Sequence, residues 1–123
     1  MLEPHVPVVF VVDDEVVISE SLAQILEKSG FRAFSFTNPL EAFEAMRTTP
    51  PGLLISDVVM PHMSGTELAM RVTAAYPECK ILLFSGQAAM ADLLHVARER
   101  GHNFQLLEKP IHPTELLHEI RKL

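Results

Sequence analysis

The sequence predicts an α/β fold: a doubly wound parallel sheet of five strands between two layers of helices, a (βα)5 three-layer sandwich. Two observations predict it. Apolar runs of strand length alternate five times with segments of helical period along the 123 residues, and this alternation is typical of βαβ units. The apolar runs are nearly continuous, as expected of parallel strands that are covered on both faces. Because crossovers between parallel strands are right-handed, we expect the strand order 2-1-3-4-5.

The expected strands are short and stop at polar residues. The first is the β-branched-rich run Val8-Val9-Phe10-Val11-Val12, which stops at Asp13. The others are expected at 32–36, 53–56, 80–84 and 104–107, and the one at 32–36 has the weakest pattern. No repeat or low-complexity tract divides the chain, so one domain accounts for its length. We set this domain at 8–123, after an N-terminal lead at 1–7.

The helices are predicted by their apolar period and by their end signals. In the first helix Ile18, Leu22, Ile25 and Leu26 share one face, and Gly30 ends the helix. A fourth helix is expected from four apolar positions that Gly101 closes: Met90, Leu93, Leu94 and Ala97. The other three helices begin with an N-cap residue followed by Pro or by a capping-box Glu, at Asn38-Pro39-Leu40-Glu41, Ser64-Gly65-Thr66-Glu67 and His112-Pro113.

Composition excludes several classes of function. The chain has 16 acidic and 10 basic residues and a net charge of −6, whereas a nucleic-acid-binding face requires a basic patch. The longest apolar stretch, 6–12, is far shorter than the roughly 20 residues that a bilayer requires, so we expect no membrane segment. The single cysteine, Cys79, excludes an intramolecular disulfide and is compatible with the cytoplasm, where we expect the protein.

Polar residues follow four of the five expected strands. Asp13 and Asp14 follow the first strand, Asp57 the third, Ser85 the fourth and Lys109 the fifth. In an open parallel sheet, ligands bind outside the carboxyl ends of the strands, near the point where the strand order reverses. With the expected order, the first and third strands flank that point, and we expect their three carboxylates to lie together.

The chemistry of this group is that of a phosphoryl site. Three neighbouring carboxylates repel one another and need a cation, and an all-oxygen site with one open side suits Mg²⁺. Lys109 supplies a positive charge and Ser85 a hydroxyl donor, both suited to phosphoryl oxygens. A carboxylate beside such groups is itself a nucleophile that gives an acyl phosphate, and Asp57, which stands alone after the central strand, is the candidate.

These residues give the sequence a resemblance to a known family. It resembles the receiver domain of bacterial two-component response regulators, over 8–123, and most specifically the chemotaxis regulators. The most specific signal is the Asp-x-x-Met-Pro-x-Met-x-Gly pattern at 57–65, together with its distance from the acidic pair at 13–14. The Ser85-Gly86 and Lys109-Pro110 pairs complete the match. The resemblance implies a flavodoxin-like fold.

The resemblance also implies roles for individual residues. Asp57 is the phosphoacceptor, taking a phosphoryl group from a sensor histidine kinase or a histidine phosphotransfer protein. Mg²⁺ (or Mn²⁺) is bound by Asp57 with the acidic pair, Asp14 directly and Asp13 directly or through water. The backbone carbonyl of Val59 completes the set of metal ligands.

The remaining implied roles concern phosphoryl binding and switching. Lys109 contacts a phosphoryl oxygen, and the Lys109–Pro110 peptide bond is expected to be cis. Ser85 is the switch hydroxyl that moves toward the phosphoryl group. The family often has Tyr or Phe three residues before the lysine, where this chain has Leu106, while Phe104 is expected on the same face of the strand. By its position Leu106 is assigned as a second switch residue beside Ser85, and whether it supports the usual aromatic-type switch is left open.

The expected output is a change at the surface formed by the fourth helix, the fifth strand and the fifth helix. Apart from its own phosphorylation and dephosphorylation, the domain is not expected to be an enzyme. The cognate kinase, the stimulus, the downstream target or attached output domain, and homodimerisation are left open.

The strand-end residues also bear on three other functions. A small aspartyl-phosphate phosphatase requires an Asp-x-Asp nucleophile after the first strand, where this chain has the adjacent pair at 13–14. A flavin phosphate requires a loop of backbone donors at the same place, where this chain has Asp13-Asp14-Glu15. A receiver-like module that works without phosphorylation stays an alternative, although such a module needs none of the five strand-end residues that this chain retains.

Overall fold

The computed structural model describes residues 7–86, 95, 98–101 and 104–123. Its sheet contains β1 (Val8–Val12), β2 (Arg32–Phe36), β3 (Leu53–Asp57), β4 (Lys80–Ser85) and β5 (Gln105–Glu108). All neighbouring strands are parallel, and their order is β2-β1-β3-β4-β5. The predicted fold class and strand order are therefore confirmed. The predicted strand bounds are matched to within one residue, the largest difference being a one-residue shift of β5.

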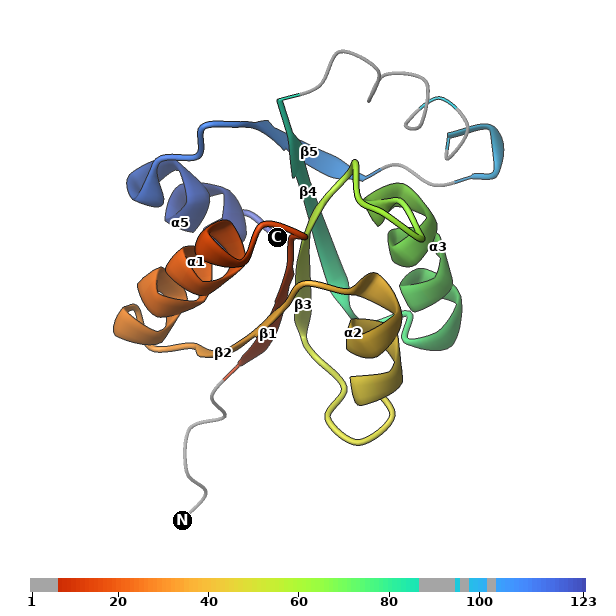
Figure 1. The fold of residues 1–123 in the computed structure, drawn as a ribbon, viewed down its shortest axis with the longest axis horizontal. Coiled ribbons are helices and arrows are strands. Elements are labelled where there is room, and N and C mark those ends of the chain that lie inside the picture. Colours follow the sequence, from red (N-terminus) through yellow and green to blue (C-terminus); the bar gives the residue numbers. More distant parts are fainter. Residues whose placement is uncertain (1–6, 87–94, 96–97, 102–103) are drawn as a thin grey trace.

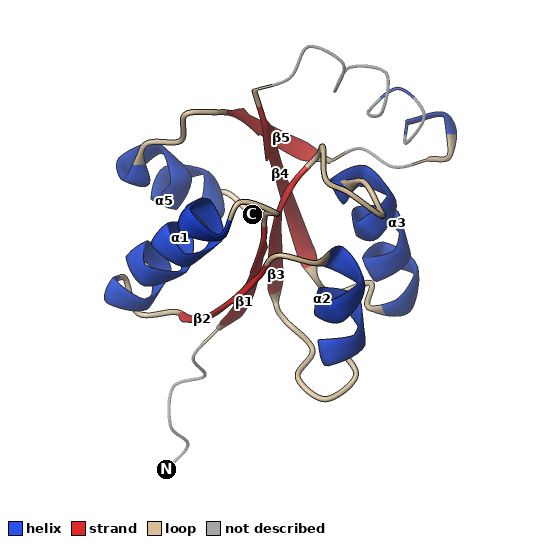
Figure 2. Cartoon of the chain, in the orientation of Figure 1, coloured by secondary structure: helices blue, strands red, loops and turns tan. Residues whose placement is uncertain are grey.

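Helices cover both faces of this sheet (Figures 1 and 2). On one side lie α1 (Val16–Lys28) and α5 (Pro113–Arg121), and on the other lie α2 (Pro39–Ala45) and α3 (Gly65–Ala75). The predicted helix at 90–97 falls almost entirely outside the described residues. None of the helices in the described ranges is long and apolar enough to cross a bilayer.

The strands divide the core into two layers because consecutive side chains of a strand point to opposite faces. In β1, Phe10 and Val12 pack against α2 and α3, whereas Val9 and Val11 pack against α1 and α5. The same alternation separates Leu83 from Phe84 in β4. Each strand therefore contributes to two cores, which explains why the strands read as continuous apolar runs.

The predicted helix starts at 38 and 64 are built as expected. The side chain of Asn38 accepts a hydrogen bond from the N–H of Leu40 at 2.9 Å, and Ser64 Oγ accepts from the N–H of Glu67 at 3.0 Å. The side chain of His112 makes no cap hydrogen bond at the start of α5. These caps fix where α2 and α3 begin, and the cap of α3 fixes the end of the loop that leaves β3.

Cys79 is buried in the layer under α2 and α3, at the start of β4. Burial disfavours the charged thiolate and raises the pKa of Cys79 to about 11. Because the folded pKa lies above the ordinary value of 9.0, this thiol stabilises the fold fully below pH 9 and loses that contribution as the pH rises toward 11.

We expect iodoacetamide at pH 8 to alkylate Cys79 at least about tenfold more slowly in the folded chain than in the urea-unfolded chain, because the buried thiol stays protonated. Mass spectrometry of timed samples measures the two rates. The free energy of unfolding should also fall less between pH 9 and pH 11 in Cys79→Ala than in the wild type. Equal alkylation rates in the folded and unfolded chains would contradict the assigned burial.

Candidate functional site

The candidate site lies at the edge of the sheet where the parallel strands end. Asp57 and Ser85 are the last residues of β3 and β4, Asp13 directly follows β1, and Lys109 directly follows β5. Because the strands are parallel and adjacent, their carboxyl ends meet at this edge. The expected juxtaposition of residues that are distant in sequence is therefore present.

Asp13 is held at both of its carboxylate oxygens. Its side chain is fully buried. Oδ1 accepts a hydrogen bond from the N–H of Glu15 at 2.9 Å, and Oδ2 accepts from Lys109 Nζ at 3.0 Å. A buried carboxylate is stable only when it is paired and hydrogen-bonded. Glu15, two residues away in sequence, supplies the backbone hydrogen bond, and Lys109, 96 residues away, supplies the positive charge.

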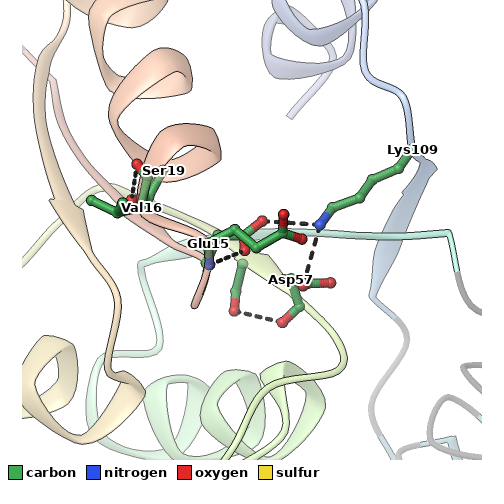
Figure 3. A network of polar contacts seen from close by, with 7 residues as sticks. Glu15, Val16, Ser19, Asp57 and Lys109 are labelled. Carbon is green, nitrogen blue, oxygen red and sulfur yellow. Dashed lines mark hydrogen bonds and ion pairs between the residues drawn. The ribbon is translucent and has the colours of Figure 1, made fainter.

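Lys109 joins two carboxylates across the edge of the sheet (Figure 3). Its Nζ lies 3.0 Å from Asp13 Oδ2 and 3.3 Å from Asp57 Oδ2, and 5.2 Å from the ring centroid of Phe84. Burial lowers the pKa of Lys109, but the hydrogen bond to Asp13 and the charges of Asp57 and Asp13 outweigh burial and raise that pKa. The ammonium group is therefore charged at any physiological pH.

Asp57 is nearly buried, with 6% of its surface exposed. Burial raises the pKa of Asp57, the charge of Lys109 lowers it and the charge of Asp13 raises it, and the net effect is a raised pKa. The ionised form is therefore costly at this position, and a further positive charge beside Asp57 would favour it.

Three carboxylates form a group that could hold a cation. Oxygen atoms of Asp13, Asp14 and Asp57 lie within 4.8 Å of one another. Asp13 and Asp57 are buried, whereas Asp14 is exposed. The donor set is all oxygen, contains no His or Cys, and is open to solvent on the Asp14 side, which fits Mg²⁺ or Mn²⁺ better than Zn²⁺.

A cleft of about 280 Å³ opens onto this group. Ser85, which is 1% exposed, forms part of its wall. The residues around the cleft come from the ends of β1, β3, β4 and β5, and they are Asp14, Glu15, Asp57, Val59, Ser85, Gly86 and Lys109. Six of the residues proposed from sequence thus face or adjoin one cavity. The ends of β1 and β3 supply the carboxylates, the end of β4 supplies the hydroxyl, and the end of β5 supplies the ammonium.

Two further predictions concern the Lys109–Pro110 bond and Leu106. The Lys109–Pro110 peptide bond is cis. Leu106 does not line the cleft; together with Phe104 it packs on the core layer under α2 and α3. Both side chains therefore lie on one face of the sheet, as expected from the period of two.

The backbone after Asp57 is held by Ser56 in β3 and Gly65 at the start of α3, through contacts that the sequence did not predict. A Cβ at Gly65 would lie 1.9 Å from the carbonyl oxygen of Asp57. The N–H of Gly65 donates to the carbonyl of Val58 at 2.7 Å, and Ser56 Oγ donates to the carbonyl of Asp57 at 2.9 Å. The one sequence feature that could have indicated this contact is the glycine at the end of the 57–65 pattern, because a position where two backbones approach closely requires glycine.

A parallel sheet of this order, with an acidic group and a lysine at its carboxyl edge, is the arrangement expected of a receiver domain in a signalling protein. The chain belongs to the response regulator receiver domain family, whose model matches residues 9–121. The resemblance seen in the sequence is therefore confirmed.

Individual relatives agree with this family. The chain is 35% identical over 115 residues to the response regulator receiver protein CpdR of Brucella abortus, covering 94% of each. It is 31% identical over 109 residues to the phosphoglycerate transport system transcriptional regulatory protein PgtA of Salmonella typhimurium, of which it covers 26%. The structure of a CheY-like response regulator receiver domain protein from Methanospirillum hungatei matches with a TM-score of 0.85 and 25% identity, covering 96% of this chain and 93% of that one.

We expect Gly65→Ala to destabilise the fold by at least about 2 kcal/mol, because the new methyl group would overlap the Asp57 carbonyl and force the loop after β3 to move. Urea unfolding followed by circular dichroism measures the change. Gly52→Ala is the matched control, since a Cβ there meets only an ordinary contact at 3.8 Å. A Gly65→Ala variant as stable as the Gly52→Ala variant would contradict the observed approach.

Proposed function

We propose that this receiver domain is a Mg²⁺-dependent phosphorelay switch in which Asp57 accepts a phosphoryl group from a phosphohistidine. The donor is a sensor histidine kinase or a histidine phosphotransfer protein, and the setting is the cytoplasm. The single observation that carries the proposal is the Lys109 ammonium, which lies between Asp13 and Asp57 on the cleft. It is a positive charge directly beside the carboxylate that would carry the phosphoryl group.

In the proposed step, an ionised carboxylate oxygen of Asp57 attacks phosphorus and forms an acyl phosphate. The P–N bond to the donor imidazole breaks, and the imidazole leaves with the electron pair and takes a proton. Water later attacks phosphorus, the P–O bond to Asp57 breaks, and inorganic phosphate leaves as the carboxylate is restored. Apart from this self-phosphorylation and self-dephosphorylation, no enzymatic activity is proposed.

The acidic group would hold the cation. Asp13, Asp14, Asp57 and the backbone carbonyl of Val59 are the proposed ligands, and bound Mg²⁺ would neutralise charge on the phosphoryl oxygens. Since burial raises the pKa of Asp57, a cation beside it favours the ionised form that attacks. Asp13 is held by the N–H of Glu15 and by Lys109 in the orientation described above, next to Asp14 and Asp57.

The proposed switch follows from charge. Phosphorylation adds about one to two negative charges to the cleft, and Lys109 and Ser85 are the donors that can bind them. Ser85 and Glu108 are register partners across β4 and β5, and Lys109 follows Glu108 directly. Movement of Ser85 and Lys109 toward the phosphoryl group would thus bias β5, and with it the proposed output surface. Of that surface β5 and α5 are described, and the predicted helix at 90–97 lies almost entirely outside the described residues.

A protein donor is supported by an apolar groove beside the cleft. The groove has a volume of about 460 Å³ and lies between α1 and the segment after β5. Lys109 and Phe84 line it together with apolar side chains that include Val17, which is 74% exposed. Because Lys109 borders both cavities, the groove adjoins the cleft that contains Asp57, and we propose it as the docking site of the protein donor.

We expect wild-type protein with Mg²⁺ and acetyl phosphate to gain the mass of one phosphoryl group, and Asp57→Asn to gain none. Because the pKa of Asp57 is raised, the neutral amide should keep or raise the metal-free unfolding midpoint, so a lost reaction would not reflect a lost fold. Glu41→Gln on α2 is the control with the same charge change. Identical responses of the wild type and Asp57→Asn, by intact mass and by NMR shifts with beryllofluoride, would favour the phosphorylation-independent module.

Lys109→Ala should keep the fold but uncouple phosphorylation from the conformational change. Removing the ammonium leaves Asp13 and Asp57 facing each other without a shared donor, which should cost about 1–3 kcal/mol in metal-free stability. Amide shifts of β5 and α5 on addition of beryllofluoride measure the coupling. A Lys109→Ala variant whose β5 and α5 shifts equal those of the wild type would remove Lys109 from the switch.

A further inference from the structure

Glu15 is a cleft residue that the proposed reaction does not use. It stands between the acidic pair and the first turn of α1, and its backbone N–H holds Asp13 Oδ1. Its side chain makes no cap hydrogen bond to α1, although Glu15 is the N-cap residue. The side chain instead borders the cleft with Asp57 and Lys109. Figure 3 shows it extending from the start of α1 in the direction of Lys109.

The negative charge of Glu15 is not compensated in the cleft. Its carboxylate is not in the group of three that lie within 4.8 Å of one another. Among the residues that the structure describes, no hydrogen bond or ion pair joins the Glu15 side chain to a partner. Of the described residues that line the cleft, Lys109 is the one with a cationic side chain, and it is already shared by Asp13 and Asp57. Glu15 thus adds a solvent-exposed negative charge at the entrance.

We propose that Glu15 is a specificity-determining residue that disfavours free, strongly anionic phosphodonors at this cleft. Glu15 is exposed whereas the Lys109 side chain is only 21% exposed, and both line the cleft, so an anion that approaches Lys109 passes the Glu15 carboxylate. Like charges at the mouth of a cleft lower the rate of encounter. A donor carried by a protein overcomes this repulsion through its contacts in the groove beside α1. The inference rests on the proposed function, because it concerns which donors supply the phosphoryl group to Asp57.

Two small phosphodonors that differ in net charge form the same product on Asp57, so they can be used to test a charge effect. Acetyl phosphate is the more negative: Asp57 attacks phosphorus, the bond to the acetate oxygen breaks, and acetate leaves with the electron pair. Phosphoramidate carries less net negative charge, and after the same attack its P–N bond breaks and ammonia leaves. Both give the same acyl phosphate, so a charge effect at Glu15 should be larger for acetyl phosphate.

The experiment compares Glu15→Gln and Glu15→Lys with Glu20→Gln and Glu20→Lys, all with saturating Mg²⁺. Glu20 is exposed on α1 and lines a different hollow, so its variants match the change in net charge away from the cleft. Initial rates of phosphoryl uptake are measured by intact mass at low and at high salt. Calorimetric titration with Mg²⁺ alone gives a readout that does not depend on phosphorylation.

At low salt, Glu15→Gln should take up phosphate from acetyl phosphate about 3- to 10-fold faster than the wild type, and Glu15→Lys faster still. The gain should be smaller with phosphoramidate and should shrink at high salt, because salt screens exposed charges. Mg²⁺ should bind about 2- to 5-fold more weakly to Glu15→Gln, since one negative charge has left the cleft. The Glu20 variants should show neither change.

The outcomes separate the two proposals. The first outcome is that the wild type takes up the phosphoryl group, but the Glu15 variants match the Glu20 variants in rate, salt dependence and Mg²⁺ affinity. This outcome would overturn the role of Glu15 and leave the proposed function in place. Rates that do not follow the order wild type, Glu15→Gln, Glu15→Lys would also overturn it. Absence of uptake by the wild type and by every variant would overturn the proposed function and, with it, the role of Glu15.

Discussion

The site depends on one interaction, the ammonium group of Lys109 held between the carboxylates of Asp13 and Asp57. Lys109 follows the edge strand β5, whereas its partners end the inner strands β1 and β3. Its side chain therefore crosses the end of β4 and passes the ring of Phe84. Without this cation, two nearly buried carboxylates would face each other at the centre of the sheet edge, where desolvation and repulsion both act against the charged forms.

The charged residues at this edge of the sheet carry more negative than positive charge. Lys109 compensates Asp13, which the N–H of Glu15 also stabilises, but it leaves the pKa of Asp57 raised. An oxygen-rich, partly exposed group with surplus negative charge attracts a divalent cation and repels free anions. The same surplus supports both the proposed Mg²⁺ dependence and the proposed role of Glu15 in choosing the donor.

Rigid backbone contacts keep this charged edge in place. Gly65 packs directly against the carbonyl of Asp57, and the Ser56 hydroxyl donates to the same carbonyl. Local patterns predicted the surrounding elements well: the caps at Asn38 and Ser64 form as expected. The Gly65 contact could not be predicted in the same way, because it joins a helix start to a strand end through the path of the intervening loop.

The sequence by itself determined the alternation of strands and helices, the positions of the helix caps and the polar residue at the end of each inner strand. These features are local, since they depend on the period of apolar side chains and on bonds between near neighbours. Only the tertiary structure decided that Lys109 reaches both Asp13 and Asp57, that Glu15 lies on the cleft, and that Leu106 packs away from it. Those facts depend on the twist of the sheet and on side-chain burial, which residues far apart in the chain create together.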